Sequence, residues 1–154
     1  MTKAEFEVKI KALIEEYAPE GTAFKWSRSL HNVGSCSYKS HNNEYWNFII
    51  YISWPIASCN TWEVIKKTVI HEIAHANTPN HGHDAIWKRE CLRLGGDGKR
   101  LSKPTTLGGD VVVPYKWEGI CPTCNCKFYR NRKVNGYHCR RIEPVIWTSY
   151  KIPA

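Results

Sequence analysis

The sequence has no long hydrophobic run. Within its 154 residues, the longest apolar stretches are Phe48–Ile52 and Val111–Val113, which have the length of strands. A membrane helix needs roughly 18 apolar residues. A signal peptide has an apolar segment near its N-terminus, whereas Met1–Glu7 contains charges of both signs. There is no internal repeat and no low-complexity tract. We therefore expect a soluble protein that is not secreted and acts in the cytoplasm, or in the nucleoid or nucleus.

Acidic residues are scarce in the C-terminal part of the chain. Residues 116–154 carry eight Lys/Arg and two Asp/Glu, a net charge of +6 out of a total of +8, whereas residues 1–85 carry −1. An acidic partner would therefore meet the C-terminal part. The seven cysteines are an odd number, and four of them cluster at positions 121, 124, 126 and 139. In a reducing compartment, this clustering favours a metal site over disulfides.

The hydrophobic patterns of the first half predict a helix followed by a sheet. Thr2 and Glu5 form a capping-box pattern ahead of apolar residues at helical spacing, and Pro19 with Gly21 ends that helix. Beyond it the periodicity shortens, and turn residues separate three strand-like stretches. An antiparallel three-stranded sheet is their simplest arrangement, with strands at residues 24–26, 33–38 and 45–53.

Two further helices are predicted after this sheet. The first begins at Asn60 and ends at Thr78, because Pro79 disfavours the α conformation in the residue before it. Asp84 can cap the next helix, and Gly95-Gly96 closes it. The first of these two helices has apolar residues that recur at helical spacing and should face the core: Trp62, Ile65, Val69, Ile73 and Ala76.

The same helix contains the motif His71-Glu72-Ile73-Ala74-His75. Residues four apart share a helix face, so both imidazoles can bind one ion, and Glu72 reaches the same side and can hold a metal-bound water. Zinc keeps a coordination position open for such a water and lowers its pKa to about 7. The alternative is a helix with two surface histidines and an ordinary glutamate. That alternative fits poorly with so apolar a helix, where unpaired imidazoles are costly to desolvate. The motif predicts a zinc hydrolase with Glu72 as general base.

Two histidines can supply the third ligand. His81 lies six residues after His75, which is the metzincin spacing, but Thr78 stands where that motif has glycine. His83 lies at the start of the following helix, one turn before Trp87, so packing of that turn would fix the direction of the imidazole. We favour His83, and His81 is the second choice.

The sequence around this motif resembles the SprT-like (Spartan-type) zinc metallopeptidases. The most specific part is Thr68–Ala76, followed by His83 with an aromatic residue four positions later and by Leu94-Gly95. Over the rest of residues 24–150 the resemblance rests on single features, namely Trp26, the Gly34-Ser35-Cys36 turn and the hydrophobic strand before the metal helix.

This resemblance implies an α+β protein with a zincin-like core in residues 1–112. That core would comprise the N-terminal helix, the three-stranded antiparallel sheet, the metal-binding helix and the helix after it. A basic C-terminal module, residues 113–154, would add a small zinc-ribbon-like β hairpin region. The resemblance also implies cleavage of proteins located on DNA, as in the repair of DNA–protein crosslinks. Glu72 would be the catalytic residue, and the ligands of the catalytic zinc would be His71, His75 and His83.

Cys121-Pro122-Thr123-Cys124 is a zinc-knuckle pattern, in which two thiolates can bind one tetrahedral ion. The resembled family adds a second Cys-x-x-Cys, whereas here Cys139 has Ile142 at the partner position. We expect a second, structural zinc on Cys121, Cys124 and Cys139, with Cys126 or His138 as fourth ligand. A ribbon-shaped hairpin without metal is the alternative. The other cysteines are interpreted as small buried hydrophobic residues: Cys36, Cys59 and Cys91.

Basic and aromatic residues alternate around this knuckle. Basic side chains neutralise phosphates, and aromatic rings can stack on exposed bases, so the pattern favours contact with DNA. The alternative is a solvated hairpin whose aromatic residues fill a minimal core. The basic residues are Lys127, Arg130, Arg132, Lys133, Arg140 and Arg141, and the aromatic ones are Phe128, Tyr129, Tyr137 and Trp147.

Three functions are compatible with these patterns. The first is a monomeric zinc endopeptidase that its basic tail positions on DNA or on a DNA-bound protein. The second is a nucleic-acid-binding zinc protein whose metal site is not proteolytic. The third is a zinc amidase that acts on a small substrate. Glu72 favours an enzyme, because a structural site has no use for a base beside its ligands.

Overall fold

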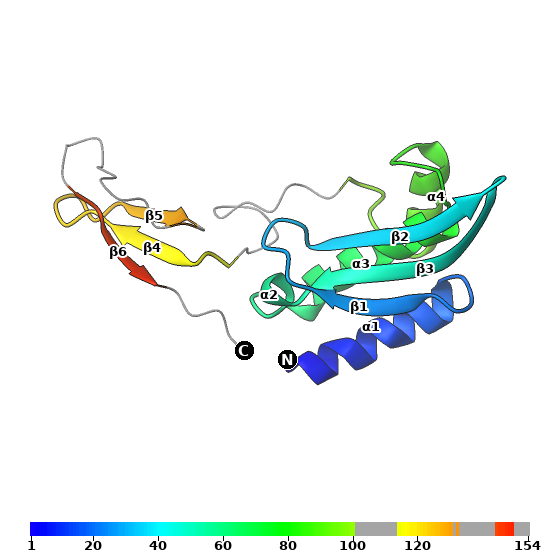
Figure 1. The fold of residues 1–154 in the computed structure, drawn as a ribbon, viewed down its shortest axis with the longest axis horizontal. Coiled ribbons are helices and arrows are strands. Elements are labelled where there is room, and N and C mark those ends of the chain that lie inside the picture. The colour runs from blue at the N-terminus through cyan, green and yellow to red at the C-terminus, as the bar shows by residue number, and fades with distance from the viewer. Residues whose placement is uncertain (101–113, 131, 133–143, 150–154) are drawn as a thin grey trace.

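The computed structural model describes residues 1–100, 114–130, 132 and 144–149. Over residues 1–100 one helix is followed by three strands and then by three helices in a mixed α+β arrangement, and a second small sheet follows near the C-terminus (Figure 1). The predicted α+β class is confirmed. The boundary predicted between residues 112 and 113 lies outside the described residues.

Helix α1, Lys3–Tyr17, begins at the capping box that the sequence predicts. The Thr2 hydroxyl accepts a hydrogen bond from the Glu5 N–H, and the Glu5 carboxylate accepts one from the Thr2 N–H. Both otherwise orphaned donors of the first turn are thereby satisfied. The buried face of the helix consists of Phe6, Ile10 and Ile14.

The first sheet has the strand order β1-β3-β2, with β1 at Ala23–Ser27, β2 at Gly34–His41 and β3 at Glu44–Ser53. The prediction of an antiparallel sheet is wrong for β1. That strand pairs with β3 in parallel, whereas β2 pairs with β3 antiparallel. Strands that are neighbours in the sequence usually pair, but β1 and β2 lie on opposite sides of β3.

Residues 28–33 link β1 to β2 and pass the end of β3. This crossing places β1 and β2 on opposite sides of β3. Ser53, the last residue of β3, holds the link there. Its N–H donates to the Val33 carbonyl at 2.8 Å, and its hydroxyl donates to the Ser29 carbonyl at 2.6 Å. The sequence patterning predicts strands but not this crossing. As a result, β2 is an edge strand among the described strands of the sheet.

Three helices follow the sheet: α2 at Trp54–Ala57, α3 at Trp62–Asn77 and α4 at Ala85–Arg93. The four-residue α2 was not predicted. Asn60 donates its side-chain N–H to the Ile56 carbonyl at the end of α2, and Thr61 rather than Asn60 is the N-cap of α3. Asp84 caps α4 as predicted, since its Oδ1 accepts the N–H groups of Ile86 and Trp87, both at 3.0 Å.

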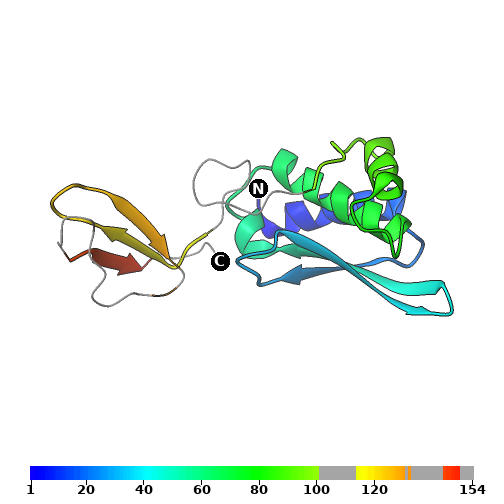
Figure 2. The same cartoon turned by 90° about the horizontal axis from the view of Figure 1, so that it is seen from above.

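The helices lie on one side of the first sheet, with α3 against β2, β3, α1 and α4 (Figure 2). Four of the five α3 residues predicted to face the core are almost inaccessible to solvent, and Trp62 packs partly buried against Phe6. The metal motif is therefore carried by the most central helix of the domain. The remaining core comes mainly from α1, β3, α2 and α4, including Ile10, Ile50, Ile56 and Trp87.

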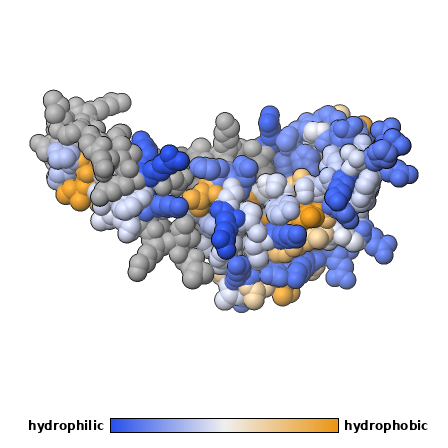
Figure 3. Space-filling model, in the orientation of Figure 1, coloured by the Kyte–Doolittle hydropathy of each residue, from blue (hydrophilic) through white to orange (hydrophobic). Residues whose placement is uncertain are grey.

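The surface is largely hydrophilic in the view of Figure 3, with small apolar areas between charged side chains. Among the described residues, the exposed large hydrophobic side chains are spread over the N-terminus, α1, β3, α4 and β6: Met1, Val8, Tyr17, Trp46, Ile86, Leu92 and Ile146. None of the described helices combines the length and the apolar character that crossing a bilayer requires.

The C-terminal sheet has the order β5-β4-β6, with β4 at Trp117–Ile120, β5 at Lys127–Arg130 and β6 at Ile146–Ser149. Both pairings are antiparallel. The predicted hairpin corresponds to β4 and β5, and β6 adds a third strand. Cys121 and Val145 form its buried core, against which Cys124, Phe128 and Trp147 pack.

Removing the Ser53 hydroxyl should destabilise the domain. Ser53 is fully buried, and its Oγ also accepts the Ile56 N–H at 3.2 Å, so Ser53→Ala leaves two backbone groups without their partner. We expect a loss of about 1–3 kcal/mol in the free energy of unfolding, measured by urea denaturation. Ser40→Ala, at an exposed position of β2, is the control and should change stability little. Equal stability of both variants would contradict this role of Ser53.

Candidate metal centre

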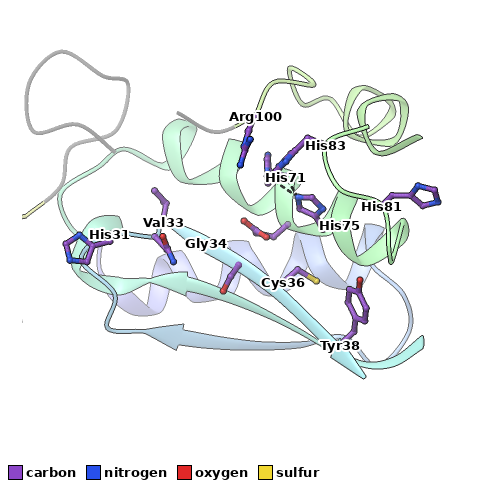
Figure 4. Close-up of a pocket in the computed structure, with 13 residues that line it drawn as sticks. His31, Val33, Gly34, Cys36, Tyr38, His71, His75, His81, His83 and Arg100 are labelled. Carbon is purple, nitrogen blue, oxygen red and sulfur yellow. Dashed lines mark hydrogen bonds between the residues drawn. The ribbon is translucent and has the colours of Figure 1, made fainter. Parts of the chain in front are cut away.

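Three histidines from two elements meet at one side of α3 (Figure 4). His71 and His75 lie one turn apart on α3, which the apolar spacing of that helix buries against the sheet. His83 comes from the loop between α3 and α4, one residue before the N-cap Asp84. The centre is therefore formed by a buried helix and by the short loop that leads from it into α4.

The three Nε2 atoms form a nearly equilateral triangle. The separations are 3.2 Å between His71 and His75, 3.2 Å between His75 and His83, and 3.0 Å between His83 and His71. Three such nitrogens cannot all be hydrogen-bonded to one another, because each carries either one proton or one lone pair. They do fit around one ion at the zinc–nitrogen distance of about 2.0–2.1 Å, with N–ion–N angles of about 95–105°. The residues present therefore fit a metal ion held by three imidazoles.

The charge state of the histidines suits metal binding. Burial, together with the charges of His75 and His83, lowers the pKa of His71 to about 3. Burial also lowers the pKa of His75, as does the proximity of His83, and the pKa of His83 is lowered by burial and by the charge of Arg100. At neutral pH the imidazoles are therefore uncharged and their lone pairs are free to bind a cation.

Trp87 supports all three imidazoles. Its indole is almost completely buried, and its ring centroid lies 4.7 Å from that of His71, 5.2 Å from His75 and 4.6 Å from His83. The sequence spacing predicts the contact with His83, but the contacts with the two α3 histidines depend on how α4 packs on α3. One aromatic side chain thus restricts the orientation of the whole triad.

Backbone groups orient two of the rings from behind. The His71 ring donates a hydrogen bond to the backbone of Lys99 and the His75 ring donates one to that of His81, and each bond raises the pKa of its ring. A backbone group with this effect is a carbonyl that accepts the ring N–H. Such a bond would fix the tautomer and leave the other ring nitrogen free to bind an ion.

Glu72 lies beside the triad and is buried, with 5% of its surface exposed. Burial raises its pKa to about 8, opposed by a hydrogen bond from the backbone of Cys36. A cation in the triad would lower this pKa again, because an opposite charge favours the carboxylate. The protonation state of Glu72 would therefore depend on whether the centre holds an ion.

Gly34 allows the edge strand to lie directly against this carboxylate. A Cβ atom at Gly34 would approach Thr68 Cγ2 to 2.7 Å and Glu72 Cγ and Oε1 to 3.0 Å, closer than side chains tolerate. The role of Gly34 as the contact surface of Glu72 was not predicted. Gly34-Ser35-Cys36, predicted to be a turn from the family pattern, instead begins strand β2, and its contact with Glu72 depends on the packing of β2 on α3.

A cleft of about 490 Å³ runs along β2 past the triad. One wall consists of the first half of the edge strand, and the other of α3 and the loop after it (Figure 4). The lining residues are His31, Asn32, Val33, Gly34, Ser35, Cys36, Tyr38, His71, Glu72, His75, His81, His83 and Arg100. Glu72 is the single carboxylate among these lining residues, and it borders the same cleft as the three histidines.

His81 is not in the triad. Its Nδ1 lies 2.7 Å from Asp84 Oδ2, while His83 joins the two helical histidines. Asp84 uses its other carboxylate oxygen to cap α4, so this contact ties the loop to the start of that helix. The structure thus brings His83, the histidine favoured from the sequence, together with His71 and His75, and it places His81 outside this group.

The predicted knuckle forms a tight turn in the C-terminal sheet. The Asn125 N–H donates to the Cys121 carbonyl at 2.9 Å, and the Cys121 N–H donates to the Cys126 carbonyl at 3.1 Å. Cys121 is buried, Cys124 half-buried and Cys126 exposed. Two further candidate ligands lie outside the described residues, namely Cys139 and His138.

The predicted DNA-contacting residues are described in part. Lys127, Arg130 and Arg132 are exposed, although Lys127 lies 3.4 Å from the Glu118 carboxylate. Phe128 and Trp147 pack against the small core, which agrees with the alternative that these two rings fill it. Tyr129 packs on Tyr115 with ring centroids 4.0 Å apart. Outside the described residues lie Lys133, Tyr137, Arg140 and Arg141.

These features define an α+β protein with a three-histidine centre that can hold a metal ion beside a buried glutamate. The model of the SprT-like family matches residues 5–106, well over half of the sequence, and the chain belongs to that family. Membership indicates a function of the metallopeptidase type. Comparison with curated proteins and with solved structures finds no match.

The buried carboxyl should make the metal-free protein less stable at alkaline pH. The Glu72 pKa is about 8 in the folded protein against an ordinary 4.5, so the unfolded chain loses this proton first. The free energy of unfolding should therefore fall as the pH rises between these two values. Glu72→Gln cannot titrate and should lack this decline. Urea denaturation with chelator, at about pH 5 and about pH 8, tests the difference, and identical pH dependence of both proteins would contradict it.

Proposed function

We propose that this protein is a zinc-dependent endopeptidase of the SprT-like family. The observation that supports this proposal best is the position of Glu72, buried against Gly34 and facing the same cleft as three converging imidazoles. Of the two candidates for the third ligand, we propose His83, because its Nε2 completes the triangle.

The chain would divide the chemistry among few residues. Zinc, when bound, supplies a Lewis acid that polarises the scissile carbonyl and lowers the pKa of a bound water to about 7. His71, His75 and His83 would hold this ion, and all three line the cleft. The Glu72 carboxylate takes the proton of the attacking water and later gives it to the leaving amine nitrogen.

The edge strand indicates how a substrate lies in the cleft. β2 pairs only with β3 among the described strands, and its residues Gly34–Cys36 line the cleft beside Glu72. An extended peptide can add to such an edge through backbone hydrogen bonds, which places a backbone carbonyl next to the base. This geometry favours a polypeptide substrate over the small substrate of an amidase.

We also propose that the substrates are proteins on DNA and that the basic C-terminal region contacts the nucleic acid. The family resemblance suggests this substrate, and the net charge of +6 over residues 116–154 supports the contact. A structural zinc on Cys121, Cys124 and Cys139 would stabilise this region. A nucleic-acid-binding protein with a non-proteolytic metal site would explain the charge but not Glu72.

Substitutions at the centre should separate metal binding from catalysis. Glu72→Gln should keep the zinc of the centre and reduce cleavage of a casein-type substrate by a factor of about 10³ or more, because the general base is lost. His71→Ala should lose that zinc. Elemental analysis counts the ions per chain, with two ions expected in the wild type and one in His71→Ala. Full activity of Glu72→Gln would refute the mechanism.

Removing the C-terminal region should weaken DNA binding. A protein that ends before Tyr115 loses the region with net charge +6, so its affinity for a DNA duplex should fall and its salt dependence should flatten. Fluorescence anisotropy at several salt concentrations measures both effects. Equal affinities of the full and the truncated protein would place DNA binding elsewhere or exclude it.

A further inference from the structure

The loop between α3 and α4 carries the most exposed histidine of the three. His71 is buried and His75 is half-buried, both on the central helix, whereas His83 is exposed and lies outside a helix. Only residues 78–84 separate the two helices. The position of the third Nε2 therefore depends on what fixes this short loop.

Two side-chain contacts hold the loop in place, one within the loop and one from the sheet. Asp84 holds His81 from the start of α4, a local contact three residues apart. Tyr38 holds Asn80 from the sheet, since its hydroxyl accepts the Asn80 N–H at 2.8 Å across 42 residues of sequence. Asn80 has a φ of +65°, a left-handed conformation that reverses the chain just before the ligand.

Tyr38 is itself firmly placed. The pairing of β2 with β3 shifts register between Ser37 and Lys39, and such an irregularity redirects a side chain. The Tyr38 ring packs edge-on against Tyr45 at a centroid distance of 5.5 Å, and against Phe48 at 5.7 Å. In Figure 4 its hydroxyl points from the end of β2 toward the loop that carries His81 and His83.

We propose that Tyr38 is a positioning residue that holds the His83 loop to the sheet and thereby raises the affinity of the three-histidine centre for its ion. Tyr38 touches the loop backbone and acts on the metal through His83. The proposal rests on the metal site of the proposed function but not on proteolysis. Loss of one partner behind a metal ligand typically weakens binding about 10- to 100-fold, and we expect about tenfold here.

Tyr38→Phe tests this role because it removes the acceptor and keeps the ring. Cobalt(II) is the probe, since histidine-bound and thiolate-bound cobalt absorb differently and a site in the C-terminal region does not interfere. Titration of the full chain should give about tenfold weaker binding at the histidine centre and an altered d–d spectrum. Tyr45→Phe removes the same atom from the neighbouring ring, which does not line the cleft, and should bind cobalt like the wild type.

A double-mutant cycle shows whether the effect passes through His83. Adding Tyr38→Phe to His83→Ala should cause no further loss of cobalt affinity, because the loop then carries no ligand. Hydrogen exchange of the Asn80 amide should accelerate in Tyr38→Phe without metal, which reports the broken contact directly.

Unchanged affinity in Tyr38→Phe, or an equal loss in both backgrounds, would overturn the proposal. Reduced cleavage with unchanged affinity would also overturn it and make Tyr38 a substrate contact. Absence of peptidase activity in the wild type would leave these affinities valid and refute only the proposed function.

Discussion

The centre depends on three uncharged imidazoles whose lone pairs converge on one point. Bringing three nitrogen atoms within 3.0–3.2 Å of one another is unfavourable without a cation between them, since at least one pair has no hydrogen to share. The surrounding structure maintains this arrangement through the buried Trp87, the backbone groups behind His71 and His75, and the loop of His83. The packing around the three histidines thus maintains a geometry that a metal ion would stabilise.

Burial shifts the pKa values of His71 and Glu72 in opposite directions. It lowers the pKa of His71, which keeps the imidazole neutral, and it raises the pKa of Glu72, which favours the protonated carboxyl. Both effects follow from the central position of α3 between the sheet and its neighbouring helices. The same helix burial that stabilises the core therefore also sets the chemistry of the site.

Local patterns in the sequence predict the features that depend on spacing along one element. The capping box of α1, the Asp84 cap and the shared face of His71 and His75 are all of this kind. The features that were missed depend on how distant segments meet. The parallel pairing of β1 follows from hydrogen bonds at Ser53, and the contact of Gly34 with Glu72 follows from the packing of β2 on α3. No periodicity encodes either of them.

All three imidazoles come from residues 71–83, so α1 and the sheet donate none of them. An ion at this point bridges a very short length of chain, and the chain entropy removed by such a bridge grows only with the logarithm of the length enclosed. This ion differs in that respect from structural metals that join remote segments and whose removal unfolds a small domain. The packing of α1 and of the sheet on α3 does not pass through this ion, so its removal would leave those contacts in place.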